Sequence, residues 1–259
     1  MLNCFKKEIL NQKYTYFMIS KNQIKLITGL HQKKYRHQHQ LFIAEGEKVI
    51  LEFINAGYTL EYLFVTEYIN SFESIAQKEL IAGADLNKIS CLTTANNCLA
   101  VFKIPTQKPI SNLGLKVILD DLQDPGNLGT IIRLCDWFGI SDLICSTKTV
   151  DLYNPKVVQA TMGSMARITV TYCDIADYIK KSKLLVFGTF MGGENIYKQQ
   201  VPENALLILG NEGNGISEEI EKLVTNKIAI PRFGALQKTE SLNVASAAAI
   251  FLSEFKRNY

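Results

Sequence analysis

The stretch LILGNEGNGI, which runs from Leu207 to Ile216, decides how the second half of this chain folds. An apolar run enters a turn that holds three glycines and a single carboxylate, Glu212. Glycines ahead of a helix can let backbone N–H groups approach an anion, as they do in a phosphate-binding loop. The spacing here is G-x-x-G-x-G, however, and no Lys-Ser or Lys-Thr pair follows it. The pattern therefore argues against a phosphate loop and leaves a plain tight turn open.

On both sides of this turn, apolar segments alternate with helical segments from residue 115 to residue 259. The expected strands are KVILDD, DLICS, RITVTY, LLVFGTF, ALLILG and KIAIP, and the expected helices lie near 127–138, 154–162, 174–182, after Ser217 and over 242–256. Near-continuous apolar strands flanked by helices indicate a parallel sheet that is covered on both faces. On this pattern alone we expect a Rossmann-like open α/β sheet.

The N-terminal part reads as a separate small α/β domain over residues 18–104. We expect helices near 19–30 and 72–82, and Thr94 is placed to cap another helix. Residues 1–17 carry no convincing amphipathic pattern, so we interpret them as a disordered leader and Met18 as the natural start. Two prolines, two amide side chains and a glycine mark the end of the domain, and we assign 105–114 as a linker.

Composition is that of an ordinary soluble protein, with 47% hydrophobic and 20% charged residues in a chain of 259. No segment approaches the roughly 18 uninterrupted apolar residues that a membrane-spanning helix needs, and no secretory signal pattern is present. We therefore expect a cytoplasmic protein that does not bind a membrane. The six cysteines include no C-x-x-C pair, which favours buried reduced thiols over disulfides or a metal site.

Positive charge is concentrated near the N-terminus, although the net charge is only +3. Residues 21–40 hold five cations and no acid, namely Lys21, Lys25, Lys33, Lys34 and Arg36. This asymmetry indicates a polyanionic partner, and a solvated helix face is the alternative. His37 and His39 are two positions apart and do not share a helix face, so we expect no metal site there.

Three stretches stand at expected strand ends, where open α/β sheets place their ligands. They are DPGNLGTIIR, LGNEGNGI, and IPRF followed by ESLNVASA. In this order and spacing they closely resemble the three motifs of the SpoU (TrmH-type) RNA 2′-O-ribose methyltransferases, within the SPOUT superfamily. The resemblance is strong over 115–257 and looser over 20–104, where FIAEGEKVILE looks like the family's ribosomal-protein-like N-terminal substrate-binding domain.

The resemblance implies a fold that differs from an open Rossmann sheet. Members of the family thread the C-terminal segment through a loop to form a deep trefoil knot, although knots are otherwise rare. The second and third stretches would then lie side by side, with the last helix closing the fold. Family members also form homodimers through the knotted domain, so we expect a homodimer here.

The resemblance also implies S-adenosylmethionine as cofactor and a ribose 2′-hydroxyl of ribosomal or transfer RNA as acceptor. The positions carried over as cofactor contacts are Leu209, Gly210, Ile230, Pro231 and Leu242. The positions carried over as catalytic are Asn127, Arg133, Glu212, Ser241 and Asn243. RNA would contact the five cations of residues 21–40, with His31, His37, His39 and an exposed Tyr35 nearby.

Several of these residues have simpler interpretations. Asn127 and Ser241 are of the type that caps helices, Glu212 could cap the turn after it, and Arg133 could be an ordinary surface arginine. The family mechanism proposes that Arg133 activates the hydroxyl, but a guanidinium stays protonated, so orienting the substrate is physically easier. The nine residues 232–240 make a longer loop than the family's commonest one, and Gly234 and Lys238 within it are candidates to shape the RNA entrance.

Two other functions compete with the methyltransferase hypothesis. A catalytically inactive RNA-binding or ribosome-assembly protein of the same fold should have lost Arg133, Glu212 or Asn243, and all three are present. A dinucleotide-dependent Rossmann enzyme should carry an early G-x-G-x-x-G with an acid about 20 residues later, and the sequence has neither.

Overall fold

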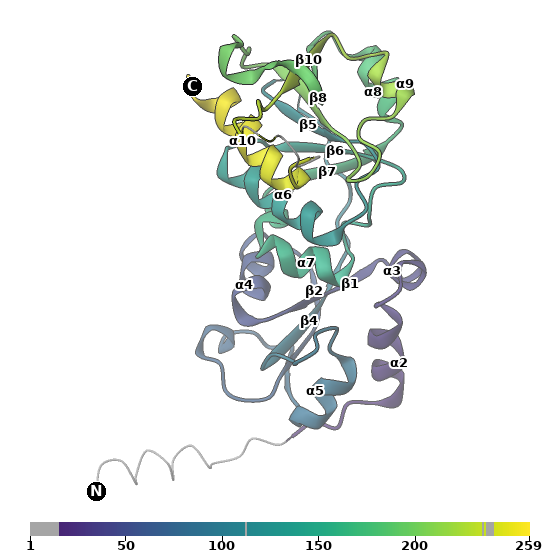
Figure 1. Cartoon of the computed structure of the whole chain (residues 1–259). Coiled ribbons are helices and arrows are strands. Elements are labelled where there is room, and N and C mark those ends of the chain that lie inside the picture. Colours follow the sequence, from purple (N-terminus) through teal and green to yellow (C-terminus); the bar gives the residue numbers. More distant parts are fainter. Residues whose placement is uncertain (1–15, 112, 235, 237–240) are drawn as a thin grey trace, which may run out of the picture. The chain divides into compact units, whose positions relative to one another are not determined.

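The computed structural model describes residues 16–111, 113–234, 236 and 241–259, and the chain divides into two compact units, 1–105 and 106–259 (Figure 1). Residues 1–15 of the expected leader lie outside the described residues. The backbone N–H of Phe17 donates to the carbonyl of Leu80 at 2.8 Å, so the described end of that segment is tied to the first unit.

The first unit is a small α/β domain built on one sheet. Its elements are α2 (Lys21–Gly29), α3 (Lys33–His39), β1 (Leu41–Glu45), α4 (Glu47–Asn55), β2 (Leu60–Val65), η1 (Asn70–Phe72), β3 (Lys78–Leu80), α5 (Gly83–Ile89) and β4 (Cys98–Lys103). Among the described residues the sheet has the order β1-β4-β2-β3, with β4 antiparallel to both neighbours and β3 parallel to β2.

Alternating side chains of this sheet build two cores. Phe42 of β1 and Phe102 of β4 stack with ring centroids 5.7 Å apart and meet Phe53 of α4. Their neighbours Ile43 and Val101 point to the other face and pack with residues of α2 and α5. A capping box at Ser20 starts α2, because the Ser20 and Gln23 side chains each accept a hydrogen bond from the other's backbone N–H.

Two predictions within this unit are wrong. The expected helix 72–82 is instead the turn η1 followed by β3, because Lys78 to Leu80 pair with β2 and tertiary pairing overrides local propensity. Thr94 caps no helix, since the apolar run after it is β4, which lies between β1 and β2 with five buried residues.

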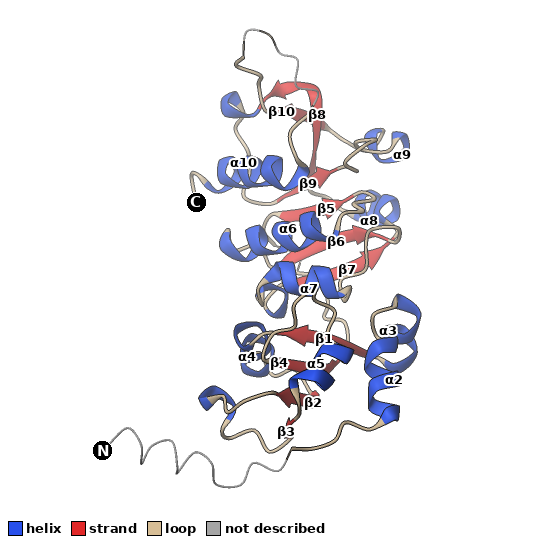
Figure 2. Ribbon diagram, turned by 60° about the horizontal axis from the view of Figure 1, so that its bottom comes forward, coloured by secondary structure: helices blue, strands red, loops and turns tan. Residues whose placement is uncertain are grey.

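The second unit contains the parallel sheet (Figure 2). Its elements are β5 (Lys116–Leu119), α6 (Pro125–Trp137), β6 (Asp142–Ser146), α7 (Pro155–Thr161), η2 (Ser164–Ala166), β7 (Thr169–Cys173), α8 (Ile175–Lys181), β8 (Leu185–Asn195), η3 (Ile196–Lys198), β9 (Ala205–Leu209), α9 (Glu218–Glu221), β10 (Asn226–Ala229) and α10 (Val244–Lys256). Every strand pair in the described part of this sheet is parallel, as the apolar strand pattern predicts.

Helices cover both faces of this sheet. Val186 of β8 packs in a cluster with Ile118, Ile144 and residues of α8 and α9. Its neighbour Phe187 points to the opposite face, where its ring meets that of Phe255 of α10 at 5.2 Å. The α/β class with two covered faces is therefore confirmed.

The strand order departs from a Rossmann sheet. The order is β10-β8-β9-β5-β6-β7, so β9 lies between β8 and β5, whereas a Rossmann arrangement would place β8 beside β5 (Figure 2). Because parallel strands end at the same edge of a sheet, this insertion brings the turn after Leu209 next to the loop after Leu119.

Helices α6 and α10 border that edge and pack against each other (Figures 1 and 2). The sequence predicts that α6 opens at Asn127, but the helix begins at Pro125 with Asp124 as its N-cap. The sequence also places the start of the last helix near Ser241, but α10 begins at Val244 with Asn243 as its N-cap. In the described residues, no helix is long and apolar enough to cross a membrane.

Candidate active site

Asn127 links the three motif loops. Its Nδ2 donates to Oε1 of Glu212 at 3.1 Å, and its Oδ1 accepts a hydrogen bond from Nδ2 of Asn243 at 2.9 Å. Asn127 follows β5, Glu212 follows β9, and Asn243 follows β10. One half-buried amide thus fixes loops that are far apart in the sequence at a single place.

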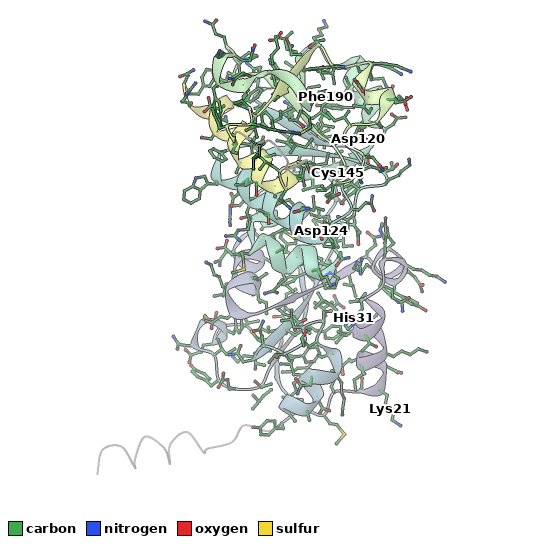
Figure 3. All side chains as sticks on the ribbon, in the orientation of Figure 1. Lys21, His31, Asp120, Asp124, Cys145 and Phe190 are labelled. Carbon is green, nitrogen blue, oxygen red and sulfur yellow. The ribbon has the colours of Figure 1, made fainter. Side chains whose placement is uncertain are left out.

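The start of α6 leaves the Asn127 side chain available for this link. Asp124 caps the helix by accepting from the backbone N–H of Asn127 at 2.7 Å, and Pro125 occupies a first-turn position that needs no N–H donor. Asp124 and Asp120 flank the loop after β5 (Figure 3). The capping interpretation of Asn127 is therefore wrong, because its neighbour performs that task.

Glu212 is an exposed carboxylate that holds the loop after β5. Its Oε2 accepts from the backbone N–H of Gln123 at 3.2 Å, and its Oε1 accepts from that of Asp124 at 3.1 Å. Partial burial raises its pKa, but the hydrogen bonds from Asn127 and from backbone N–H groups outweigh this, and the net pKa lies below its usual 4.5. Glu212 is therefore ionised at neutral pH and acts as an acceptor.

The turn 210–215 closes tightly on itself. A Cβ on Gly210 would lie 2.1 Å from the carbonyl carbon of Gly215, so no larger residue fits. Asn211 and Gly215 exchange two backbone hydrogen bonds of 2.9 Å. The glycine spacing therefore reflects a backbone that passes very close to itself.

Asn211 is a structural partner of this site that the sequence analysis missed. Its Nδ2 donates to the carbonyl of Asp121 at 2.7 Å, and its Oδ1 accepts from the backbone N–H groups of Gly213 and Asn214. It therefore organises the turn and joins it to the loop after β5. An asparagine that begins a glycine-rich turn is the signal that could have revealed it.

The two aspartates that follow β5 also belong to the site and were not among the predicted residues. Asp120 is buried and its Oδ2 accepts from the backbone N–H of Ser217 at 2.8 Å, which positions the chain after the turn. Asp121 adopts a positive φ of 63°, an unfavourable conformation for a residue with a Cβ. Two successive acids directly after an apolar strand were the available signal.

Arg133 and Ser241 are not joined to this network. The Arg133 side chain is exposed on α6 and makes no hydrogen bond or ion pair with the residues that the structure describes. Six positions along a helix turn a side chain by roughly 240°, so Arg133 and Asn127 leave α6 on different faces. Ser241 is exposed, and the cap of α10 is provided by Asn243, whose Oδ1 accepts from Ala245 and Ser246.

The candidate cofactor contacts differ in exposure. Leu209 and Gly210 are buried at the end of β9, so they can offer only backbone groups. Ile230 and Pro231 are half-buried, and Leu242 is 50% exposed. Leu209 ends β9, and Ile230 and Pro231 directly follow β10 in the same parallel sheet. Lys238 of the long loop lies outside the described residues, and Gly234 is exposed.

The candidate RNA contacts of the first unit separate into two groups. Lys21, Lys25, Lys33 and Lys34 are exposed on α2 and α3. Arg36 is only 2% exposed, and its Nη1 donates to the carbonyls of Leu30 and His31 at 2.8 and 3.0 Å. Its assignment as an RNA contact is therefore wrong, since a buried guanidinium that holds the α2–α3 connection cannot reach a phosphate.

Three further predictions concern Tyr35, the buried cysteines and metal binding. Tyr35 is half-buried, not exposed as predicted, and its ring stacks near that of His39. Burial raises the pKa of the Cys135 thiol to about 12, so it is protonated and unreactive at neutral pH. Within the described ranges, no group of three or more His, Cys, Asp or Glu side chains is arranged to hold a metal ion.

Known families match both units. Residues 114–253 match the family described as SpoU rRNA Methylase, and residues 21–100 match the MRM3-like substrate binding domain. The chain is 30% identical over 242 residues to the 23S rRNA (guanosine(2553)-2′-O)-methyltransferase RlmP of Bacillus subtilis (strain 168), covering 90% of this chain and 96% of that protein.

Solved structures agree with these matches. A protein of Porphyromonas gingivalis assigned to the TrmH family of RNA methyltransferases superposes with a TM-score of 0.84 at 36% identity, covering 94% of this chain and 100% of that chain. The AdoMet-bound rRNA methyltransferase of Sinorhizobium meliloti superposes with a TM-score of 0.81 at 27% identity, covering 95% of this chain and 98% of that chain.

Proposed function

Because this chain belongs to the SpoU rRNA methylase family, we propose that it transfers a methyl group from S-adenosylmethionine to a ribose 2′-hydroxyl of ribosomal or transfer RNA. The observation that carries this proposal is the contact of Asn127 with both Glu212 and Asn243. The named relative modifies a guanosine of 23S rRNA.

The loops at this edge fit S-adenosylmethionine. When bound, this cofactor supplies an electrophilic methyl group on a sulfonium centre. We propose that the backbone of Leu209 and Gly210 approaches it closely, since Gly210 carries no side chain to interfere. The apolar side chains of Ile230, Pro231 and Leu242 would cover its flat adenine ring, and the half-exposed Leu242 is accessible for this contact.

The low pKa of Glu212 argues against a role as general base. A carboxylate that already accepts three hydrogen bonds, and whose pKa lies below 4.5, takes up a proton poorly at neutral pH. We assign Glu212 to positioning: it holds the loops after β5 and β9 in register. Its Oε2 accepts one hydrogen bond and could accept a second from a hydroxyl. Asn127 and Asn243 would act through the same positioning, with Ser241 beside them.

Arg133 is assigned to orienting the RNA. Its guanidinium stays protonated, so it can bind a phosphate and cannot take the hydroxyl proton. Arg133 and Trp137 are four positions apart on the exposed side of α6, and the Trp137 side chain is 84% exposed. We propose that this side of α6 belongs to a homodimer interface, which would bring Arg133 toward the site of the second copy.

We further propose that the C-terminal segment forms the trefoil knot of the family. The support is the strand order: the chain passes from β8 inward to β9, outward to β10, and back to α10 beside α6.

In the first unit, exposed Lys21, Lys25, Lys33 and Lys34 would bind RNA phosphates without reading sequence. The match to a substrate binding domain supports that assignment.

Two measurements test this function. Calorimetry should detect S-adenosylmethionine binding to the purified protein, and mass-spectrometric mapping should show one 2′-O-methylated nucleotide missing from the RNA of a deletion strain. If the protein binds no S-adenosylmethionine and every ribose methyl survives the deletion, the enzyme assignment fails. Binding of the cofactor without any missing methyl would favour the catalytically inactive alternative.

A further inference from the structure

A short loop after β6 is fastened to the loop after β5. Residues 147–150 follow β6, which pairs with β5, so the two loops leave the sheet side by side. The backbone N–H of Asp121 donates to Ser146 Oγ at 3.0 Å, and that of Val150 donates to the carbonyl of Leu122 at 2.9 Å. Thr149, which is buried, donates to the carbonyl of Leu119 at 3.3 Å. The backbone on either side of Lys148 is therefore held in place.

Gln123 connects Lys148 to the candidate active site. Its Nε2 donates to the carbonyls of Lys148 at 2.8 Å and Asp121 at 3.1 Å, while its backbone N–H donates to Glu212 at 3.2 Å. One residue thus contacts both the Lys148 backbone and the Glu212 carboxylate. Lys148 consequently occupies a fixed place beside the loops that meet at Asn127.

The loops around Asn127 carry several acids, which is unfavourable for an approaching RNA strand. Asp120, Asp121 and Asp124 lie after β5, and Glu212 lies after β9. Carboxylates repel phosphates, so the strand needs a cation where it passes these loops. Lys148 provides one: its Nζ lies 3.8 Å from Oδ2 of Asp121, and its side chain is 80% exposed.

The ion pair with Asp121 is easily exchanged. A long ion pair whose lysine is largely exposed to solvent adds little to stability, so replacing the carboxylate by a phosphate costs little. Because the backbone at Lys148 is already fixed, only the side chain has to become ordered when a phosphate binds. We propose that Lys148 binds a phosphate of the RNA strand next to the nucleotide that is methylated. This inference rests on the proposed function.

The test compares Lys148→Ala with Lys181→Ala in the full-length protein. Lys181 is a matched control because it is an exposed lysine paired with an aspartate, Asp177 on α8, at the opposite edge of the sheet. Binding of a fluorescein-labelled single-stranded RNA oligonucleotide is measured over a series of KCl concentrations. Loss of one phosphate contact should reduce the slope of log K against log[KCl] by about 0.7 in Lys148→Ala and leave it unchanged in Lys181→Ala.

Kinetics on ribosomal RNA purified from a deletion strain give a second readout. Lys148→Ala should raise KM for RNA about tenfold and leave kcat within about twofold, and Lys148→Arg should restore most of the affinity. S-adenosylmethionine affinity, measured by calorimetry, should be the same in all variants. An unchanged salt slope and KM in Lys148→Ala overturns the proposal, and so does a loss of cofactor affinity, which would reveal a structural role. If the wild-type protein transfers no methyl group, the proposed function fails, while the salt slope still decides whether Lys148 contacts RNA.

Discussion

At the scale of single residues, the site depends on an amide that both donates and accepts. Asn127 can join Glu212 and Asn243 because its side chain offers an N–H group to a carboxylate and a carbonyl to another amide. The sequence placed these residues in one family motif series, but the hydrogen bonds between them follow from strand order and could not be read from spacing. Asn211 and Asp121, which support this arrangement, are indicated in the sequence only by their places at the start of a glycine-rich turn and after an apolar strand.

Substitution of Asn127 should disconnect the loops. Asn127→Asp replaces the donor to Glu212 by a second carboxylate, so we expect S-adenosylmethionine affinity to fall about tenfold and kcat/KM about a hundredfold. Calorimetry and steady-state kinetics measure both. Asn154→Ala is the control, because the Asn154 side chain caps α7 by accepting from the nearby backbone N–H of Lys156 and lies outside the Asn127 network. Equal activity of Asn127→Asp and Asn154→Ala would contradict the proposal that Asn127 positions the loops of the active site.

The pKa of Glu212 predicts a pH-dependent contribution to stability. Burial raises this pKa, but the donors around the carboxylate lower it more, so the folded-state value lies below 4.5. The stabilisation is therefore fully present above that pH and is lost as the pH falls through the folded-state pKa. Glu212→Gln should have a lower Tm than wild type at pH 7, and the two Tm values should converge in acid. A difference that stays constant down to acid pH contradicts this assignment.

Arg36 shows what composition cannot reveal. Five cations within residues 21–40 form one cluster in the sequence, yet four are exposed and one is buried beneath the connection of α2 and α3. Charge content predicts a basic surface, whereas the position of each cation on the helix decides whether it belongs to that surface.

At the scale of elements, the turn 210–215 has no room for a side chain at Gly210, whereas Gly213 has room for a methyl group. Gly210→Ala would place a methyl group about 2 Å from the backbone of Gly215, so we expect Tm to fall by roughly 6–12 °C and cofactor binding to be lost. In Gly213→Ala the added Cβ would lie 3.6 Å from Asn211, an ordinary contact, and Tm should stay close to that of wild type. Differential scanning calorimetry compares the two. An equal Tm for both variants would contradict the close approach of Gly210 to the backbone of Gly215.

Long apolar patterns predict their helices and strands correctly, whereas a short strand that is held by a distant partner cannot be predicted from local sequence. Alternation of apolar strands and helices predicts nearly every element of the second unit, because buried parallel strands require apolar residues on both faces. The helix expected over 72–82 does not form, because the short strand β3 pairs with β2, a partner that local sequence does not identify. Helix starts were displaced by two or three residues, since Asp124, Asn127, Ser241 and Asn243 are all capping types.

At the scale of the whole molecule, the insertion of β9 between β8 and β5 places the loop that holds Glu212 beside the loop that leads to Asn127. The sequence predicts a parallel sheet and a ligand at its carboxyl edge, but strand order depends on long-range pairing that periodicity does not encode. Only the family resemblance indicated that the second and third stretches would lie close together. The observed order shows why the first motif joins them.

The proposed homodimer can be tested through the single tryptophan. Trp137→Glu places a charge on the exposed side of α6, so we expect light scattering to show a shift from dimer to monomer and activity to fall as Arg133 loses the neighbouring site. Trp137 fluorescence should also shift to longer wavelength on dilution of the wild-type protein. A wild-type protein that is monomeric at all concentrations, yet fully active, contradicts the interface.

The most direct test of the central claim is to find where the methyl group goes. Protein-free ribosomal RNA from a deletion strain is incubated with the purified enzyme and S-adenosylmethionine carrying a deuterated methyl group, and the RNA is digested and examined by mass spectrometry. We predict that the label appears on a ribose 2′-oxygen at one nucleotide, and that Asn127→Asp greatly reduces it. Label on a nucleobase, or no label with RNA and cofactor both bound, would contradict the account.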